Sequence, residues 1–245
     1  MDYLANYFEQ YGQLFFTGMV DTTIMTCVSC ILAYVIGLPV GVWYNCTTPN
    51  GLRPNPKLNF VLGWIINILR AMPFVILMVA IQPFTRLLVG SSLGVAAACV
   101  PLTITAAPFV ARIVEQSLAE VDTGVVEATR SFGASDWQII KVLLRESLPS
   151  IIRGAAISFV TLFGFTAMAG CIGAGGLGDI AVRYGYQRFM PDVMVGAVIL
   201  CIIFIVVFQV IGDTLSAKLD HRHSLSSQGK RRRKKREAAS FSVVK

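Results

Sequence analysis

Long apolar runs without a charged residue are the feature that most limits what this chain can fold into. Such runs cover residues 22–52, 87–111, 154–178 and 193–212, and a fifth run, residues 58–85, is interrupted only by Arg70. A helix needs about 20 apolar residues to cross the ~30 Å hydrocarbon layer of a bilayer. The runs therefore predict five membrane spans. The composition agrees, because 55% of the residues are hydrophobic and only 14% are charged, which excludes an ordinary water-soluble enzyme.

The spans are predicted to be α-helices, which gives an all-α membrane protein. Every backbone polar group must be paired within lipid, and the runs lack the alternation of polar and apolar residues that marks barrel strands. Residues 1–13 contain two acidic residues and no Lys or Arg, so they lack the basic start of a cleavable signal peptide. We expect residues 1–13 to form an extracytoplasmic segment ahead of a first span that stays in the mature protein.

The positions of Lys and Arg predict the direction of the chain across the membrane. The net charge of +7 arises entirely beyond residue 212, in a tail with ten basic residues. With five spans and a cytoplasmic tail, seventeen basic residues fall in cytoplasmic segments and three fall outside. Because Lys and Arg are enriched in cytoplasmic loops, we expect the N-terminus outside and the C-terminus in the cytoplasm.

The tail, residues 214–245, is predicted to be disordered and to contact membrane lipid. Residues 230–236 are all Lys or Arg, and a basic run next to a membrane attracts anionic lipid by about 1 kcal/mol for each residue near the surface. Nucleic-acid binding is the less favoured alternative. We expect no metal or other cofactor, since the chain has only two histidines and its six cysteines are scattered.

The loop of residues 112–153 contains the capping signals of two short helices. Asp122 is a candidate N-cap, and Gly133 can end the first helix in a left-handed conformation. Ser135 and Gln138 fit a capping box that opens a second helix, whose extension Pro149 should limit. Two short helices joined at Gly133 would project from the cytoplasmic face, and such a projection could fit into a groove of a partner protein. An ordinary interfacial hairpin is the alternative.

Within this loop, Glu127, Ala128, Thr129 and Gly133 resemble the Glu-Ala-Ala-x-x-x-Gly signature of ABC-transporter permeases, which precedes the penultimate span as it does here. The methionine subfamily of these permeases is similar over about residues 14–223. The stretches that carry this likeness are residues 67–74, 83–86, 108–112, 173–179 and 183–189. One departure concerns the second helix: the family pattern places Leu-Pro at Arg145 and Glu146, whereas this chain has Leu148-Pro149.

The resemblance implies a type I ABC importer permease fold over residues 14–213, with residues 112–153 as the loop that couples to an ATPase. It implies a homodimer in a bacterial plasma membrane, two copies of a separate cytoplasmic ATPase, and an extracytoplasmic methionine-binding protein. The chain would then be a transporter subunit rather than an enzyme, and it would import methionine by alternating access. The residues expected in the coupling loop are Glu127, Ala128, Thr129, Gly133, Ser135 and Trp137.

The chain itself lacks a nucleotide site. No Gly-x-x-x-x-Gly-Lys-Ser/Thr phosphate loop occurs, so a partner must hydrolyse ATP. Residues 173–178 match Gly-x-Gly-x-x-Gly, but that pattern binds dinucleotides only between a strand and a helix of a parallel sheet. At the outer end of a membrane helix, its glycines would instead let the chain turn and let helices approach closely.

Candidates for a gate or pathway come from two spans. Arg70 and Pro73 could mark a kink at a cytoplasmic gate or face the pore, or Arg70 could lie at the interface and extend to lipid headgroups. The fourth span offers small polar and apolar groups that suit methionine, although helix packing is the more ordinary role for them. These residues of the fourth span are Ser158, Thr161, Thr166 and Met168.

Three other functions stay open at this point. The same scaffold could import another amino acid or a small organic solute, or the chain could be a stand-alone channel or an intramembrane enzyme. An intramembrane enzyme should show paired carboxylates, a nucleophile with His or Lys, or a metal-binding pattern in its spans, and these spans contain no His or Lys.

Overall fold

The computed structural model describes residues 2–219, and each regular element in that range is a helix. The predicted all-α class is therefore confirmed. The expectations about the basic tail concern residues that lie almost entirely outside this range. The elements are α1 (Asp2–Cys46), α2 (Pro56–Ala71), α3 (Phe74–Ala80), α4 (Gln82–Val89), α5 (Val95–Ala119), α6 (Thr123–Ser131), α7 (Asp136–Gly170), α8 (Gly176–Asp179), the π-helix η1 (Ile180–Tyr186) and α9 (Pro191–Leu219).

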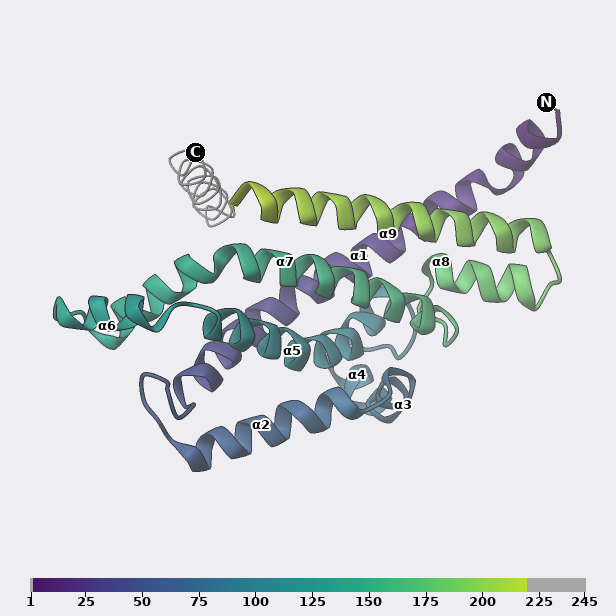
Figure 1. Ribbon diagram of the computed structural model, residues 1–245. Coiled ribbons are helices and arrows are strands. Elements are labelled where there is room, and N and C mark those ends of the chain that lie inside the picture. Colours follow the sequence, from purple (N-terminus) through teal and green to yellow (C-terminus); the bar gives the residue numbers. More distant parts are fainter. Residues whose placement is uncertain (1, 220–245) are drawn as a thin grey trace, which may run out of the picture.

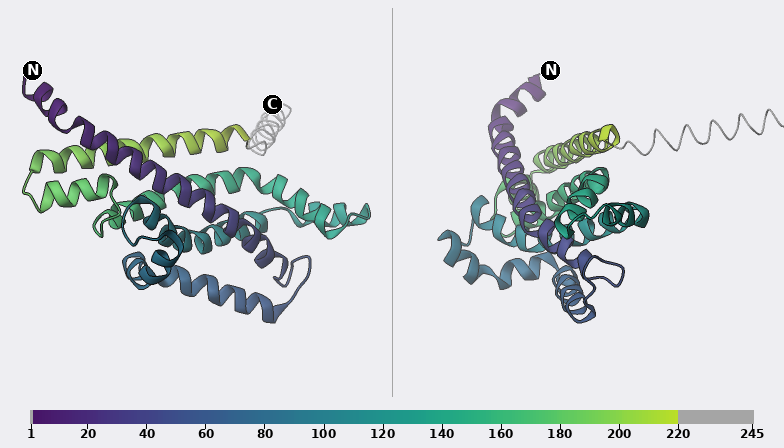
Figure 2. Two further views of the ribbon diagram at one scale, coloured as in Figure 1. Left: turned by 180° about the vertical axis from the view of Figure 1, so that it is seen from behind. Right: turned by 90° about the vertical axis from the view of Figure 1, so that its left-hand side faces the viewer.

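The long helices form an elongated bundle with distinct ends (Figure 1). One end, called here the α6 end, carries α6, the α1–α2 connection and the start of α7; the other, the α8 end, carries α3, α4, α8 and η1. Seen from behind, α1 runs obliquely across the whole bundle (Figure 2). The start of α1 lies at the α8 end and α9 finishes at the α6 end, so the two lie on opposite sides of the bundle.

Four helices are long and apolar enough to cross a bilayer, and α2 with α3 makes a fifth span if this bent pair is counted as one. The pair is bent by 98° where Met72 and Pro73 separate the two helices. Residues 58–85 are therefore not the straight span that their composition suggests. Proline disfavours a helical conformation in the residue before it, which explains a break at this point.

Helices α1 and α5 pack closely because α1 presents glycines to α5. A Cβ atom added at Gly37 would lie 2.6 Å from the carbonyl oxygen of Ala107, and one at Gly41 would lie 2.5 Å from that of Ala111. These glycines are four residues apart and so share one face of α1. Small residues at such a face allow two membrane helices to approach until their backbones nearly touch. Helix α5 is consequently the most buried of the candidate spans.

The structure corrects the prediction that Pro149 limits the second coupling helix. Helix α7 is continuous from Asp136 to Gly170 and contains Pro149. Proline removes one helical hydrogen bond, but the buried positions continue in one register on both sides of it, so tertiary packing outweighs the local cost. These buried positions are Ile139, Leu143, Ser147, Ile151, Gly154 and Ser158. In addition, the Ser216 hydroxyl of α9 donates a hydrogen bond to the Pro149 carbonyl oxygen at 3.0 Å.

Two other boundaries differ from the apolar runs. Helix α1 begins at Asp2 rather than near residue 22, so residues 2–13 are helical and continuous with the first long helix. Helix α7 ends at Gly170, and the glycines that follow form a turn with positive φ at Gly173, Gly175 and Gly176. A charge-free run cannot distinguish a helix from a glycine turn at its end, because both lack charge.

We predict that Gly41→Val disrupts the α1–α5 contact, since its Cβ would also lie 2.8 Å from the Cβ of Val114. The expected result is a lower melting temperature in detergent and less full-length chain in the membrane. Gly164→Ala is the matched control, because a Cβ at this α7 position meets nothing within 4 Å. Equal melting temperatures for both variants would contradict the close packing of α1 on α5.

Candidate coupling site

The α6 end contains the two helices that the loop sequence predicts. Asp122 caps α6, with its Oδ1 accepting a hydrogen bond from the backbone N–H of Gly124 at 2.7 Å. Gly133 follows with φ of +77°, the left-handed conformation expected for it. Helix α7 then starts at Asp136, and the Gln138 Oε1 accepts a hydrogen bond from the backbone N–H of Ser135 at 2.8 Å. The predicted helix–glycine–helix unit is therefore present.

Helix α6 has one face toward the bundle and one toward the outside. Val125 and Val126 pack against the core, whereas Glu127 and Ala128 are exposed. Phe132, the residue just before Gly133, has 91% of its surface exposed. An exposed aromatic ring beside the exposed face of α6 makes Phe132 a candidate contact for a partner protein. Sequence reasoning missed Phe132, although an aromatic residue beside the glycine of a predicted tip was a usable signal.

Trp137 lines a surface beside the end of α1, together with Trp43 and Cys46. It lies at the start of α7, next to Asp136, whose Oδ2 pairs with the Arg53 Nε of the α1–α2 connection at 2.7 Å. The Lys141 ammonium lies 5.6 Å from the centre of the Trp137 ring. The six residues expected in the coupling loop therefore do not form a single patch, because Trp137 lies beside the end of α1.

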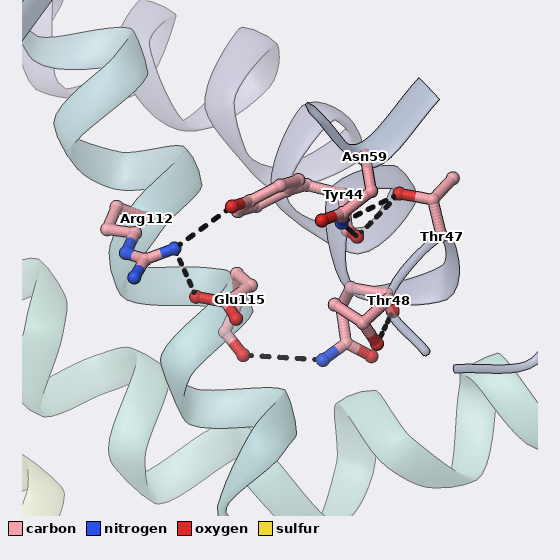
Figure 3. A network of polar contacts seen from close by, with 7 residues as sticks. Tyr44, Thr47, Thr48, Asn59, Arg112 and Glu115 are labelled. Carbon is pink, nitrogen blue, oxygen red and sulfur yellow. Dashed lines mark hydrogen bonds and ion pairs between the residues drawn. The ribbon is translucent and has the colours of Figure 1, made fainter. Parts of the chain in front are cut away.

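A polar network joins α1, α2 and α5 near the same end (Figure 3). The Arg112 guanidinium donates to the Tyr44 hydroxyl at 3.3 Å and pairs with the Glu115 carboxylate at 3.2 Å. Asn59 of α2 donates from its Nδ2 to the Tyr44 carbonyl oxygen at 3.2 Å and to the Thr47 hydroxyl at 3.1 Å. Charged and amide groups thus bind three helices together where the apolar spans end. No motif or spacing of these residues along the chain indicated this network.

At the α8 end, the glycine turn after α7 rests on α1. The Thr22 hydroxyl accepts a hydrogen bond from the backbone N–H of Leu177 at 2.9 Å. A Cβ at Gly176, where φ is +80°, would lie 2.6 Å from that hydroxyl oxygen. The glycines here allow a turn and a close approach, as expected from their place at the end of a membrane helix. Helix α7 therefore connects the α6 end directly to a turn anchored on α1.

The pathway candidates of α7 divide into two groups. Ser158 and Thr166 are buried within the protomer, and their hydroxyls donate to carbonyl oxygens of their own helix. Thr161 is half-buried and Met168 is exposed. Ser158 and Thr166 thus have the surroundings of helix-packing residues, whereas only Thr161 and Met168 reach the protomer surface.

Arg70 lies in the last turn of α2, one residue before Ala71 at the helix end. Its guanidinium is 5.9 Å from the ring centre of Phe109, which lies near the middle of the apolar helix α5. Helix α2 begins at the α6 end and leads away from it (Figure 1). Arg70 is exposed and lies at the end of α2 that points away from the α6 end. Pro73 is at the 98° bend just beyond it.

Comparison with known proteins gives one consistent result. Two curated relatives, each named as a probable D-methionine transport system permease protein MetI, come from Vibrio cholerae and Haemophilus influenzae. The first is 46% identical over 220 residues, covering 89% of this chain and 98% of the relative. The second is 44% identical over 207 residues, covering 84% of this chain and 97% of the relative.

Solved structures agree with the sequence relatives. A chain of the MetNI methionine ABC transporter, in an inward-facing conformation, superposes with a TM-score of 0.85 at 44% identity, covering 87% of this chain and 99% of that chain. A chain of an amino acid ABC transporter crystallised with histidines shares the fold, with a TM-score of 0.72 at 17% identity. The model of the family described as binding-protein-dependent transport system inner membrane component matches residues 33–224. The chain therefore belongs to the family of inner membrane components of binding-protein-dependent transport systems.

Proposed function

We propose that this chain is the permease subunit of an ATP-driven methionine importer in the bacterial inner membrane. The observation that carries the proposal is the 44% identity with the solved methionine ABC transporter over 99% of that transporter's chain. The match covers 87% of this chain, and its TM-score of 0.85 shows the same fold. Import of another amino acid on the same scaffold is the alternative that a substrate assay separates.

The proposed transporter contains other subunits besides this chain. This chain has no phosphate loop, so we assign ATP hydrolysis to two copies of a separate cytoplasmic ATPase. Two copies of the permease would form the pathway, and an extracytoplasmic methionine-binding protein would deliver substrate.

We place the α6 end and the end of α9 in the cytoplasm, and the start of α1 outside. The distribution of Lys and Arg supports this orientation, as does the position of the start of α1 and the end of α9 on opposite sides of the bundle.

We assign coupling to the surface formed by Glu127, Ala128, Thr129, Phe132 and Gly133, called here the α6 tip. Seated in a groove of each ATPase subunit, the tip would move when ATP binding draws those subunits together. Because α7 is one helix of 35 residues, about 50 Å long at 1.5 Å per residue, a displacement at Ser135 reaches the glycine turn at the α8 end. The ATPase need only shift the equilibrium between two conformations of the membrane domain by a few kcal/mol.

We expect Gly133→Val to reduce methionine uptake and uptake-linked ATP hydrolysis by at least about tenfold. A β-branched residue is poorly tolerated at φ of +77°, so the tip would lose its shape although nothing lies within 4 Å of the added Cβ. Membrane insertion should be unchanged. The measurement is labelled methionine uptake in a strain that lacks its own methionine importer, with ATPase activity of the purified complex.

Gly90→Val is the control for this experiment. Gly90 has φ of +83° and equally open space around it, but it lies at the α8 end. Its substitution imposes the same local strain far from the proposed ATPase contact. The ratio of ATP hydrolysed to methionine imported should therefore stay near the wild-type value. Wild-type uptake by Gly133→Val, or equal uncoupling by both variants, would argue against the α6 tip as the coupling surface.

We further assign Arg70 to the pathway. A charged side chain deep in a bilayer costs roughly 2.5–3.5 kcal/mol on insertion scales, so an exposed guanidinium beside the middle of α5 is best placed facing water. Methionine brings a carboxylate, which a guanidinium can bind through paired hydrogen bonds. Pro73, at the nearby bend, would set the direction of this arginine. Thr161 and Met168 are the α7 residues that remain candidates for the same pathway.

Arg70→Gln should lower the maximal rate of methionine uptake about tenfold and leave the half-saturating concentration nearly unchanged, because the binding protein sets the latter. Arg70→Lys keeps the charge and should retain part of the rate. Arg86→Gln, which removes a cation from the exposed helix α4, is the matched control. Wild-type rates for Arg70→Gln would show that this arginine is outside the pathway.

A further inference from the structure

An apolar groove at the α6 end is not used by the coupling mechanism. It has a volume of about 650 Å³ and lies between the end of α1, the α1–α2 connection and the start of α7. Its apolar walls come chiefly from Leu38, Val42 and Trp43 on one side and Trp137, Ile140 and Leu144 on the other. This volume is within the range of small-molecule sites, but most of the lining is aliphatic and aromatic, and its two charged residues, Arg53 and Asp136, are paired with each other. A polar metabolite such as methionine would find few partners in it.

Basic residues lie in the lining of this α1–α7 groove and next to it in the sequence. Asp136 is the single acidic residue of the lining, and Arg53 neutralises it through their 2.7 Å ion pair. Two further cations adjoin the lining: Lys57 precedes the lining residue Leu58, and Lys141 follows Ile140 and stacks over Trp137. Both lysines are exposed. The occupant of the groove should therefore combine an apolar body with an anionic head.

The groove also lies where an apolar span gives way to polar groups. Trp43 and Trp137 are 53% and 64% exposed, and tryptophan concentrates at the boundary between hydrocarbon and headgroups. One residue after Trp43, the Tyr44–Arg112–Glu115 network begins. On the other side of the groove, exposed apolar residues of α1, including Val35 and Ile36, continue its wall toward the middle of the span. An acyl chain could follow this wall without leaving apolar surface.

We propose that the α1–α7 groove binds one anionic phospholipid, with an acyl chain against Leu38, Val42 and Leu144 and the phosphate between Lys57 and Lys141. Its assignment to the inner leaflet rests on the proposed orientation of the α6 end. The lipid would fill the space beside the Arg53–Asp136 pair and so support the start of α7, the helix that carries the motion. Binding itself does not depend on transport, so the two proposals can fail separately.

Tryptophan quenching tests this site directly. The chain has three tryptophans, and Trp64→Phe leaves only the two that line the groove. This full-length variant is placed in nanodiscs of phosphatidylcholine that contain increasing fractions of brominated phosphatidylglycerol or brominated phosphatidylcholine. We expect half-maximal quenching at about a tenfold lower fraction of the anionic lipid, because cations near a membrane surface favour anionic headgroups.

Three variants test whether the groove itself, rather than general electrostatic attraction to the protein, selects the anionic lipid. Lys57→Gln with Lys141→Gln should abolish the preference, so that both lipids quench at the same fraction. Arg130→Gln with Lys218→Gln removes the same charge from the last turns of α6 and α9, outside the groove, and should keep the preference. Val42→Phe fills the groove and should weaken quenching by both lipids.

Three results would overturn the proposal. Equal quenching by both lipids in the parent chain would mean ordinary surrounding lipid. Loss of preference in the Arg130 and Lys218 control would mean non-specific electrostatics. If inorganic phosphate removed the preference at constant ionic strength, the cations would bind a free anion rather than a phospholipid.

Discussion

The continuity of α7 is the constraint on which the rest of the account depends. One face of this helix stays buried from Ile139 to Ser158, across Pro149, so the coupling region and the fourth span cannot move as separate bodies. Its start is tied to the α1–α2 connection by the Arg53–Asp136 pair, and the glycine turn after it rests on Thr22 of α1. A force applied near Ser135 therefore acts on both ends of the membrane domain through one helix.

Apolar contacts hold the helices together within the spans, and polar contacts hold them together at the α6 end. Within the spans, contact at Gly37 and Gly41 brings α1 against α5 through dispersion and close backbone approach, since lipid offers no hydrophobic driving force between helices. At the α6 end, Arg112, Glu115, Tyr44 and Asn59 join α1, α2 and α5 through charge-assisted and neutral hydrogen bonds. The residues of this network do not include those of the α6 tip, where Phe132 is exposed.

Most of the fold could be predicted from the sequence because a bilayer permits few solutions. Charge-free runs indicated the spans, and Asp122, Gly133 and Gln138 indicated the local shape of the coupling unit. Two features could not be read this way, because the continuity through Pro149 depends on tertiary burial and the Tyr44–Arg112 contact joins residues far apart in the chain. Pro73 indicated a possible kink after α2, but it did not indicate that the bend would reach 98°. For Phe132, the signal was present in the sequence but was not used.

We propose that this chain carries methionine only when a separate ATPase hydrolyses ATP. The most direct measurement is the uptake of labelled methionine into proteoliposomes that contain the permease, its ATPase and its binding protein, with ATP accessible to the ATPase and the binding protein on the opposite face. The account predicts accumulation that requires all three proteins and stops when ATP is replaced by a non-hydrolysable analogue. Methionine flux through the permease alone, without nucleotide, would contradict it.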